Sequence, residues 1–138
     1  MNRKIIIAVL LLFAALSGCT RGSYVVRNSR EDNRPGRMSM QYGQFDGFKE
    51  TSITAKEGEI VTIAVQIVTK SGSLEVSITK DQDEKNVPYQ GKELPTSSFT
   101  VTLTEPGKYR LRAEGNKHSG SYLFTWETKE AGDTEESK

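Results

Sequence analysis

Residues 61–67 read Val-Thr-Ile-Ala-Val-Gln-Ile, an alternation with a period of two in which every second side chain is a bulky aliphatic one. Successive side chains of a β-strand point to opposite faces, so this pattern predicts a strand with one buried and one wet face. The same alternation recurs over residues 74–79, 99–103, 109–114 and 122–126. Strands with one wet face are typical of antiparallel sheets, and the series predicts an all-β, antiparallel β-sandwich, jelly-roll-like, with about seven strands.

Turn signals separate the predicted strands. Residues 70–73 and 115–120 carry glycine between two apolar runs, which predicts a hairpin at each place. Residues 105–108 read Glu-Pro-Gly-Lys, with Pro and Gly at the central positions of a type II turn. The irregular stretch over residues 81–97 is expected to cross between the two sheets. The sandwich domain is therefore predicted to span residues 37–128.

The N-terminus has the pattern of an export signal. Residues 5–16 are all apolar, and as a helix they would be about 18 Å long, well short of a hydrocarbon core of about 30 Å. This length favours a signal peptide over a lasting membrane span. Residues 16–19 then read Leu-Ser-Gly-Cys, and Cys19 is the single cysteine of the chain.

The run Leu16-Ser17-Gly18-Cys19 resembles the bacterial lipobox. This resemblance implies that the signal peptide, residues 1–18, is cleaved between Gly18 and Cys19, and that Cys19 carries the lipid. The expected location is the extracytoplasmic face of a bacterial cell membrane, with the membrane as a partner through lipidated Cys19. The alternative is an ordinary signal peptide followed by a buried cysteine.

Residues 19–36 are predicted to form a flexible basic tether, because turn-favouring residues crowd there. The tether either serves as a plain soluble linker or lies along an anionic membrane surface, and residues 24–26 could instead add an edge strand. Residues 129–138 are acidic and almost free of apolar side chains, which predicts a disordered tail. The basic residues in and beside the tether are Arg21, Arg27, Arg30, Arg34 and Arg37.

Composition excludes several classes of function. The chain has 138 residues with 19 Lys and Arg against 18 Asp and Glu, and a net charge of +1 argues against a nucleic-acid binder. Because the chain has only one Cys and one His, it can form no intramolecular disulfide, no multi-cysteine zinc site and no histidine-rich metal site. We therefore expect no cofactor, no metal and no nucleic-acid partner.

Candidate catalytic or metal-binding residues are few. His118, the single histidine, could act as a general base, but a loop position predicts that it is merely solvated. Asp81 and Asp83 have the spacing of a calcium loop. However, Lys85 stands where an EF-hand needs an oxygen ligand and Asn86 where it needs glycine. A charged crossover loop is the favoured interpretation.

The aromatic residues offer two interpretations. Tyr122, Phe124 and Trp126 share one strand face, which suits either a platform for stacking sugars or the sandwich core. We expect the core, with Trp126 mostly buried. Tyr89, beside Pro88 in the crossover, is the candidate for an exposed ligand contact.

The stretches "EG" at residues 57–58, "GKYRLRAEG" at 107–115 and "GSYLFTWE" at 120–127 resemble the bacterial pre-peptidase C-terminal type of extracellular β-sandwich. The resemblance covers roughly residues 45–128. Members of that family often carry acidic residues at the hairpin that corresponds to residues 71–74. Here that stretch has no aspartate, so no calcium site is expected in it.

The expected function is a non-enzymatic, lipid-anchored binding or structural module of the bacterial cell envelope. Its partner would be an envelope protein or polysaccharide, bound through the loops and outer faces of the sandwich. An accessory envelope hydrolase or metal-dependent enzyme is the alternative, which a polar pocket around His118 would favour. A spacer lipoprotein without a ligand is the third possibility.

Overall fold

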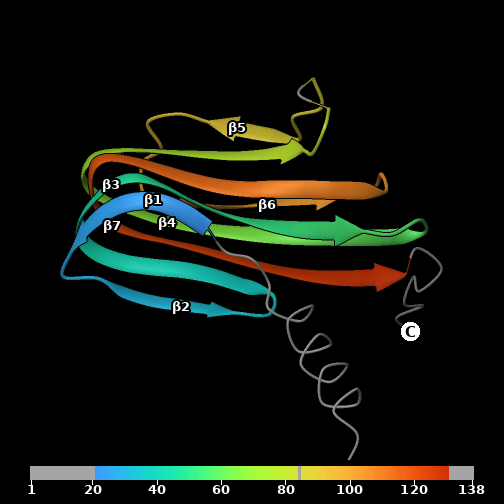
Figure 1. The fold of residues 1–138 in the computed structure, drawn as a ribbon, viewed down its shortest axis with the longest axis horizontal. Helices are drawn as coiled ribbons and strands as arrows, with labels where there is room; N and C mark the ends of the chain where they lie inside the picture. The colour runs from blue at the N-terminus through green and yellow to red at the C-terminus, as the bar shows by residue number, and fades with distance from the viewer. Residues whose placement is uncertain (1–20, 84, 131–138) are drawn as a thin grey trace, which may run out of the picture.

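The computed structural model describes residues 21–130 apart from residue 84, and these residues form strands, turns and loops only. Every pairing between the strands is antiparallel, which confirms the all-β prediction. No helix that could cross a membrane occurs in this part of the chain. The predicted signal peptide, Gly18, Cys19 and residues 131–138 of the predicted tail lie outside the described residues. In chain order the strands are β1 (Arg21–Arg27), β2 (Arg30–Arg34), β3 (Arg37–Ala55), β4 (Glu59–Lys80), β5 (Tyr89–Gly91), β6 (Ser97–Leu103) and β7 (Gly107–Glu130) (Figure 1).

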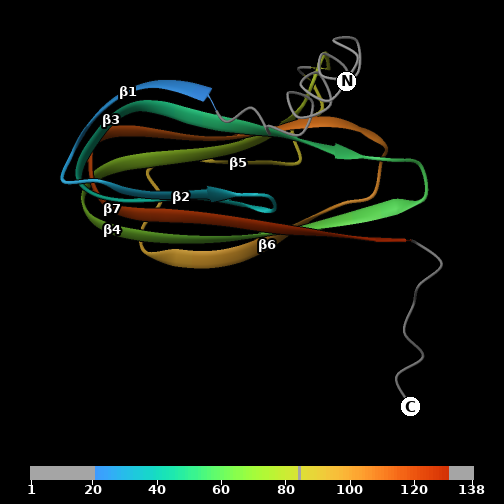
Figure 2. The ribbon, with the colours of Figure 1, turned by 60° about the horizontal axis from the view of Figure 1, so that its bottom comes forward.

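The strands β3, β4 and β7 are long enough to belong to both layers of the sandwich. Their pairing is interrupted by register shifts between Tyr42 and Gly47 and between Thr69 and Ser73. At this point the three strands bend together from one layer into the other, at the left end of the molecule in Figures 1 and 2. We call this bend the fold-over. Layer I has the order β2, β3, β7, β4 and β6, and layer II has the order β1, β3, β7, β4 and β5.

The hairpins predicted at residues 70–73 and 115–120 are wrong, because β4 and β7 run through both stretches. The glycines there serve the fold-over instead. Gly72 has φ of +73° and Gly120 has φ of +143°, a range that L side chains rarely adopt. A Cβ on Gly120 would also collide with the carbonyl oxygen of Val68. Glycine thus marks a sharp bend within one strand here, where the sequence pattern suggested a turn between two.

The crossover predicted for residues 81–97 is confirmed. On one side of it β5 pairs with residues 76–78 of β4, in layer II. On the other side β6 pairs with residues 61–67 of β4, in layer I. The chain therefore passes from one layer to the other between β5 and β6.

The prediction of a flexible tether is wrong for residues 21–34, which form the edge strands β1 and β2 against β3. Two inward-facing contacts hold them. The Tyr24 ring packs edge-on against Phe45 with centroids 5.9 Å apart, and Glu31 binds the buried Lys49 ammonium at 2.5 Å. Edge strands have much of their surface in water, which is why this segment is so polar in sequence. The sandwich therefore begins at least as early as Arg21 instead of at residue 37.

The core lies between the two layers and is built from the inward set of each alternating strand (Figure 2). Tyr122 and Phe124 belong to it, as predicted, at 1% and 0% exposure. Trp126 packs against the edge of the core and keeps only a minor part of its surface exposed, which agrees with the prediction that it is mostly buried, although it is less deeply buried than Tyr122 and Phe124. The largest fully buried side chains are Tyr109, Tyr122, Phe45, Phe124, Met38, Met40, Ile63, Ile67, Leu74, Ile78, Leu111 and His118.

Candidate functional site

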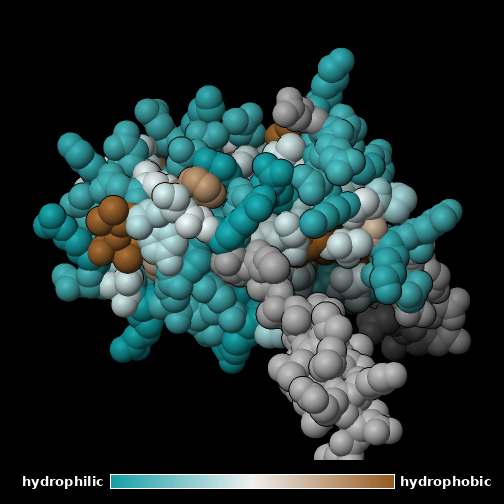
Figure 3. Space-filling view, viewed as in Figure 1, coloured by the Kyte–Doolittle hydropathy of each residue, from teal (hydrophilic) through white to brown (hydrophobic). Residues whose placement is uncertain are grey.

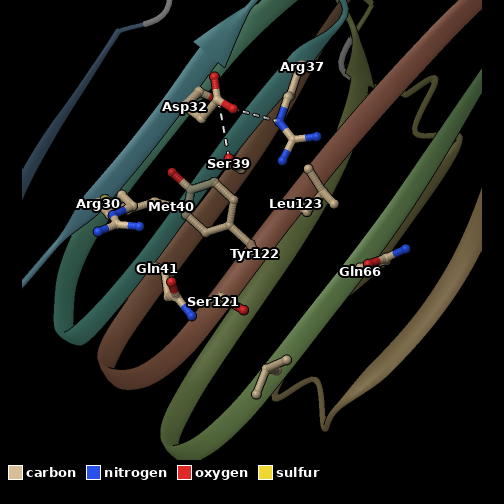
Figure 4. A pocket seen from close by; sticks show the side chains of 11 residues that line it. Arg30, Asp32, Arg37, Ser39, Met40, Gln41, Gln66, Ser121, Tyr122 and Leu123 are labelled. Carbon is tan, nitrogen blue, oxygen red and sulfur yellow. Dashed lines mark hydrogen bonds and ion pairs between the residues drawn. The ribbon is translucent and has the colours of Figure 1, made fainter.

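The outer face of layer I carries a hollow of about 300 Å³, which we call the trough (Figure 4). Its floor and walls come from the four neighbouring strands β2, β3, β7 and β4. Most of its side chains are polar, and Tyr122 is the one lining residue that the sequence analysis considered for a sugar-stacking platform. The lining residues are Arg30, Asp32, Arg37, Ser39, Met40, Gln41, Gln66, Val68, Ser121, Tyr122 and Leu123.

Strand register explains why this face is hollow. Ser39 of β3 is a short side chain near the middle of the sheet and lies opposite Leu123 of β7, which has Gln66 of β4 on its other side. In the next row Ser121 is likewise short and lies opposite Gln41. The longer side chains stand on the flanking strands and form the walls.

One end of the trough is organised by Asp32. Its Oδ2 atom lies 2.7 Å from Arg34 Nη2 and 3.2 Å from Arg37 Nε. Ser39 Oγ donates a hydrogen bond to the backbone oxygen of Asp32, at 3.2 Å, as Figure 4 shows. The Asp32 carboxylate thus accepts a hydrogen bond from Arg34 and lies within ion-pair distance of Arg37, and the exposed Arg30 adds a further positive charge to this wall. The charge-assisted contacts fix donors in place for an approaching ligand.

A second hollow of about 300 Å³ continues along the same face. The register places Ala64 opposite Thr125 and Thr62 opposite Glu127, in the rows that follow Gln66 and Leu123. Trp126 also lines this hollow. The outer face of layer I therefore offers two open hollows in line along β7, one of them beside the single tryptophan of the chain.

His118 is fully buried at the fold-over, which overturns the prediction of a solvated loop residue. Its Nε2 atom lies 2.8 Å from Thr69 Oγ1, and Thr69 donates its own hydroxyl proton to Leu94 O at 2.8 Å. Thr69 Oγ1 must therefore accept from Nε2–H, which leaves Nδ1 to accept from the Tyr42 hydroxyl at 2.5 Å. Burial lowers the pKa of His118 and raises that of Tyr42, so both groups stay neutral. Both ring nitrogens are used inside the fold, so His118 is not poised to act as a general base.

Tyr89 is half-buried on β5, at the edge of layer II, and does not line the trough. Its ring lies against Phe99 with centroids 4.5 Å apart and an interplanar angle of 35°. A ligand contact by Tyr89 stays a prediction, separate from the site on layer I.

The stretch weighed as a calcium loop is used for structure. Asp81 Oδ1 accepts from Arg110 Nη2 at 2.8 Å. Among residues 21–83 and 85–130, no three His, Cys, Asp or Glu side chains are grouped so that they could hold a metal ion.

The residues of the trough were missed because a wet strand face carries little signal by itself. The alternation of β3, β4 and β7 does place Gln41, Gln66 and Ser121 outward. Which of these residues become neighbours depends on the register, which the sequence pattern does not give. The face of the molecule seen in Figure 3 is mostly hydrophilic.

No protein-family model and no curated protein matches this chain. Solved structures do match. A low-affinity xylan-binding module from Roseburia intestinalis is 6% identical, with 80% of this chain and 94% of that chain covered and a TM-score of 0.43. A family 11 carbohydrate-binding module from Clostridium thermocellum is 10% identical, with 82% and 88% covered and a TM-score of 0.42. The secreted serine protease VesC from Vibrio cholerae is 8% identical, with 75% and 24% covered and a TM-score of 0.45. Since these TM-scores are below 0.5, the ligand has to be argued from the residues of this chain.

Proposed function

We propose that this chain is a non-enzymatic binding module of the bacterial cell envelope that holds a polysaccharide in the trough. The module is anchored to the extracytoplasmic face of the membrane through lipidated Cys19. The observation that carries the proposal is the convergence of long polar side chains from three strands on one open hollow. These are Arg30 of β2, Gln41 of β3 and Gln66 of β4.

The chemistry of the trough suits a hydroxyl-rich chain. An amide side chain offers both a donor and an acceptor, and a guanidinium offers several donors in a fixed plane, which together match vicinal hydroxyl groups. Two hollows in line along β7 suit an extended ligand better than a small enclosed one. The burial of His118 speaks against the alternative of a hydrolase, because the single histidine of the chain does not reach either hollow.

Binding of the full-length chain to purified envelope polysaccharides, measured by isothermal titration calorimetry, tests the proposal. Gln41→Ala and Gln66→Ala should each weaken binding about fivefold, the effect of one lost hydrogen bond of roughly 1 kcal/mol. Gln90→Ala is the matched control, because Gln90 is equally exposed but lies in layer II, where it donates to Glu75. If no envelope polysaccharide binds, or if Gln90→Ala weakens binding as much, the trough is not the site.

The lipid anchor is tested separately by mass spectrometry of membrane fractions. The expected mature chain begins at Cys19 and carries the mass of the added acyl groups. An intact N-terminus or an unmodified Cys19 would show that the lipobox interpretation is wrong.

A further inference from the structure

We infer that the outer face of layer II docks onto anionic membrane lipids, so that the trough on layer I points away from the bilayer. This inference rests on the proposed function, because it takes Cys19 as the site of the lipid anchor. It adds a second contact with the membrane, made by the folded domain itself, and it gives the module a fixed orientation.

The first argument is the short distance along the chain between anchor and fold. Arg21 begins β1, the edge strand of layer II, and follows Cys19 by only two residues. Two residues span at most about 7 Å. The start of β1 is thus held within roughly one Debye length, about 8 Å at physiological salt, of the lipid-modified residue. Charges beside Arg21 therefore experience the surface potential of the membrane.

The second argument is the set of charges that lies beside Arg21 on this face. The register places Glu50 of β3 between Arg21 and Arg112. In the following two rows Ser52 faces Arg110 and Thr54 faces Lys108. We call the four cations Arg21, Lys108, Arg110 and Arg112 the basic patch.

The carboxylates within the basic patch do not cancel its charge. Glu50 has a side-chain exposure of only 6%, and it lies 2.9 Å from Arg21, 3.7 Å from Arg112 and 3.9 Å from Arg110. This buried carboxylate accepts a hydrogen bond from Arg21 and lies within ion-pair distance of Arg112 and Arg110. The three side chains, Arg21, Arg112 and Arg110, remain 72%, 32% and 40% exposed. Asp81 is the second carboxylate, bound to Arg110. Glu114 is the third carboxylate and lies 3.4 Å from Arg112 Nη2. Four cations against these three anions leave one net positive charge on the basic patch.

Arg112 of the basic patch also contacts an aromatic side chain. The guanidinium carbon of Arg112 lies 3.9 Å from the centroid of the Phe48 ring, a cation–π contact on the outer face. A fixed, planar guanidinium matches phosphate oxygens well, since it can donate two parallel hydrogen bonds. Lipid phosphate groups at the membrane surface present that chemistry as a dense layer.

The other half of the face has the opposite charge. Near the fold-over, Glu75 and Glu93 line a hollow of about 410 Å³ together with Lys92 and with Glu114, which also pairs with Arg112 at the border of the basic patch. An anionic membrane would repel these carboxylates and attract the basic patch. The charge separation thus favours contact through the half that lies beside Arg21, with the fold-over tilted away from the lipid.

Single introduced cysteines can locate the docked face, because lipidation would occupy Cys19, the single native thiol. Thr79→Cys places a label in the basic patch, on β4 opposite Arg110. Thr125→Cys is the matched site beside the trough, on the outer face of layer I. Both threonines are half-buried. The full-length lipid-modified chain, labelled with a fluorophore, is reconstituted into phosphatidylcholine vesicles with or without about 30 mol% phosphatidylglycerol.

We expect phosphatidylglycerol to reduce acrylamide quenching of the label at residue 79 about threefold or more, and to leave the label at residue 125 unchanged. Salt near 1 M should restore quenching, since the Debye length then falls to about 3 Å. Lys108→Glu should abolish the protection. Lys117→Glu is the control, because Lys117 is equally exposed on the same strand but lies at the fold-over.

Equal quenching at residue 79 on both vesicle types would overturn the docking inference. Protection at residue 125 instead would show that the arginines of the trough face the lipid, and it would also overturn the inference. Failure of the chain to float with pure phosphatidylcholine vesicles would show that the anchor is absent, and the docking inference would fall with it. Flotation thus separates failure of the anchor from failure of the docking face.

Discussion

The Nδ1 atom of His118 lies 2.5 Å from the hydroxyl oxygen of Tyr42, at the place where β3 and β7 fold over together. On the other side of the ring, Nε2 reaches Thr69 of β4. One neutral imidazole therefore links the three strands that make up most of both layers. The link lies where the register of each strand shifts and ordinary ladder hydrogen bonds are interrupted.

His118→Ala should lower the free energy of unfolding by about 2–4 kcal/mol. The change empties a fully buried site and leaves the Tyr42 and Thr69 hydroxyls without their partner. Urea denaturation followed by circular dichroism measures the loss. Lys117→Ala, next in the chain and exposed, should change stability by less than about 0.5 kcal/mol. Equal effects of the two substitutions would mean that His118 does not link the strands.

The stability of the fold should fall as the pH drops below 6.5. Burial lowers the pKa of His118 from 6.5 in the folded chain, so the unfolded chain binds a proton first. The unfolded state is then favoured increasingly as the pH falls from 6.5 toward the lower folded pKa, and full stability returns above 6.5. Thermal melts between pH 5 and pH 7.5 test this. His118→Gln should flatten the dependence in that window, because the chain has no other histidine. An unchanged slope in His118→Gln would assign the effect to other groups.

The edge strands should depend on the Glu31–Lys49 ion pair. Partial burial pushes the pKa of Glu31 upward, but hydrogen bonds from Lys49 and Tyr24 outweigh this and lower it overall. Glu31→Ala would leave the Lys49 ammonium, whose side chain is 6% exposed, without its carboxylate. We expect a loss of about 2–4 kcal/mol, somewhat less than the 3–5 kcal/mol typical of a fully buried pair, because the Glu31 side chain is 30% exposed. Chemical denaturation measures it, with the exposed Glu57→Ala as the control.

Hydrogen exchange of residues 21–34 gives an independent measurement of the same pair. In the wild type these amides should be protected, since they pair with β3. In Glu31→Ala the amides of residues 21–34 should lose their protection first, while the amides of β4 remain protected. Unprotected amides in the wild type would restore the interpretation of this segment as a tether.

The strands of the sandwich follow from the sequence because one face of each is buried. Val61, Ile63, Val65 and Ile67 of β4 are all within 1% of full burial, as the alternation requires. The same reasoning fails for β1 and β2, because an edge strand buries few side chains. Its main inward contact, Glu31 with Lys49, is a charged pair that resembles a solvated surface in sequence.

The fold-over and the trough could not be predicted for a different reason. A glycine with positive φ serves a hairpin and a bent strand equally well, so Gly72 and Gly120 do not distinguish the two. The trough depends on the pairing of Ser39 with Leu123 and of Leu123 with Gln66, three residues from distant parts of the chain. Register follows from the packing of the whole core, which local patterns do not specify.

Trp126 provides the last prediction, because it lies where the core meets the second hollow. Trp126→Ala should lower the free energy of unfolding by about 1–2 kcal/mol, less than the 3–5 kcal/mol typical of a fully buried aromatic residue. Phe124→Ala, on the same strand at 0% exposure, is the matched control and should show the larger loss. Because the chain has one tryptophan, its fluorescence reports on the edge of the core beside the second hollow. A polysaccharide bound along the outer face of layer I should shift the emission and reduce acrylamide quenching, and Gln66→Ala should weaken both effects. If binding leaves the emission unchanged, the ligand occupies the trough alone and does not extend along β7 to the second hollow.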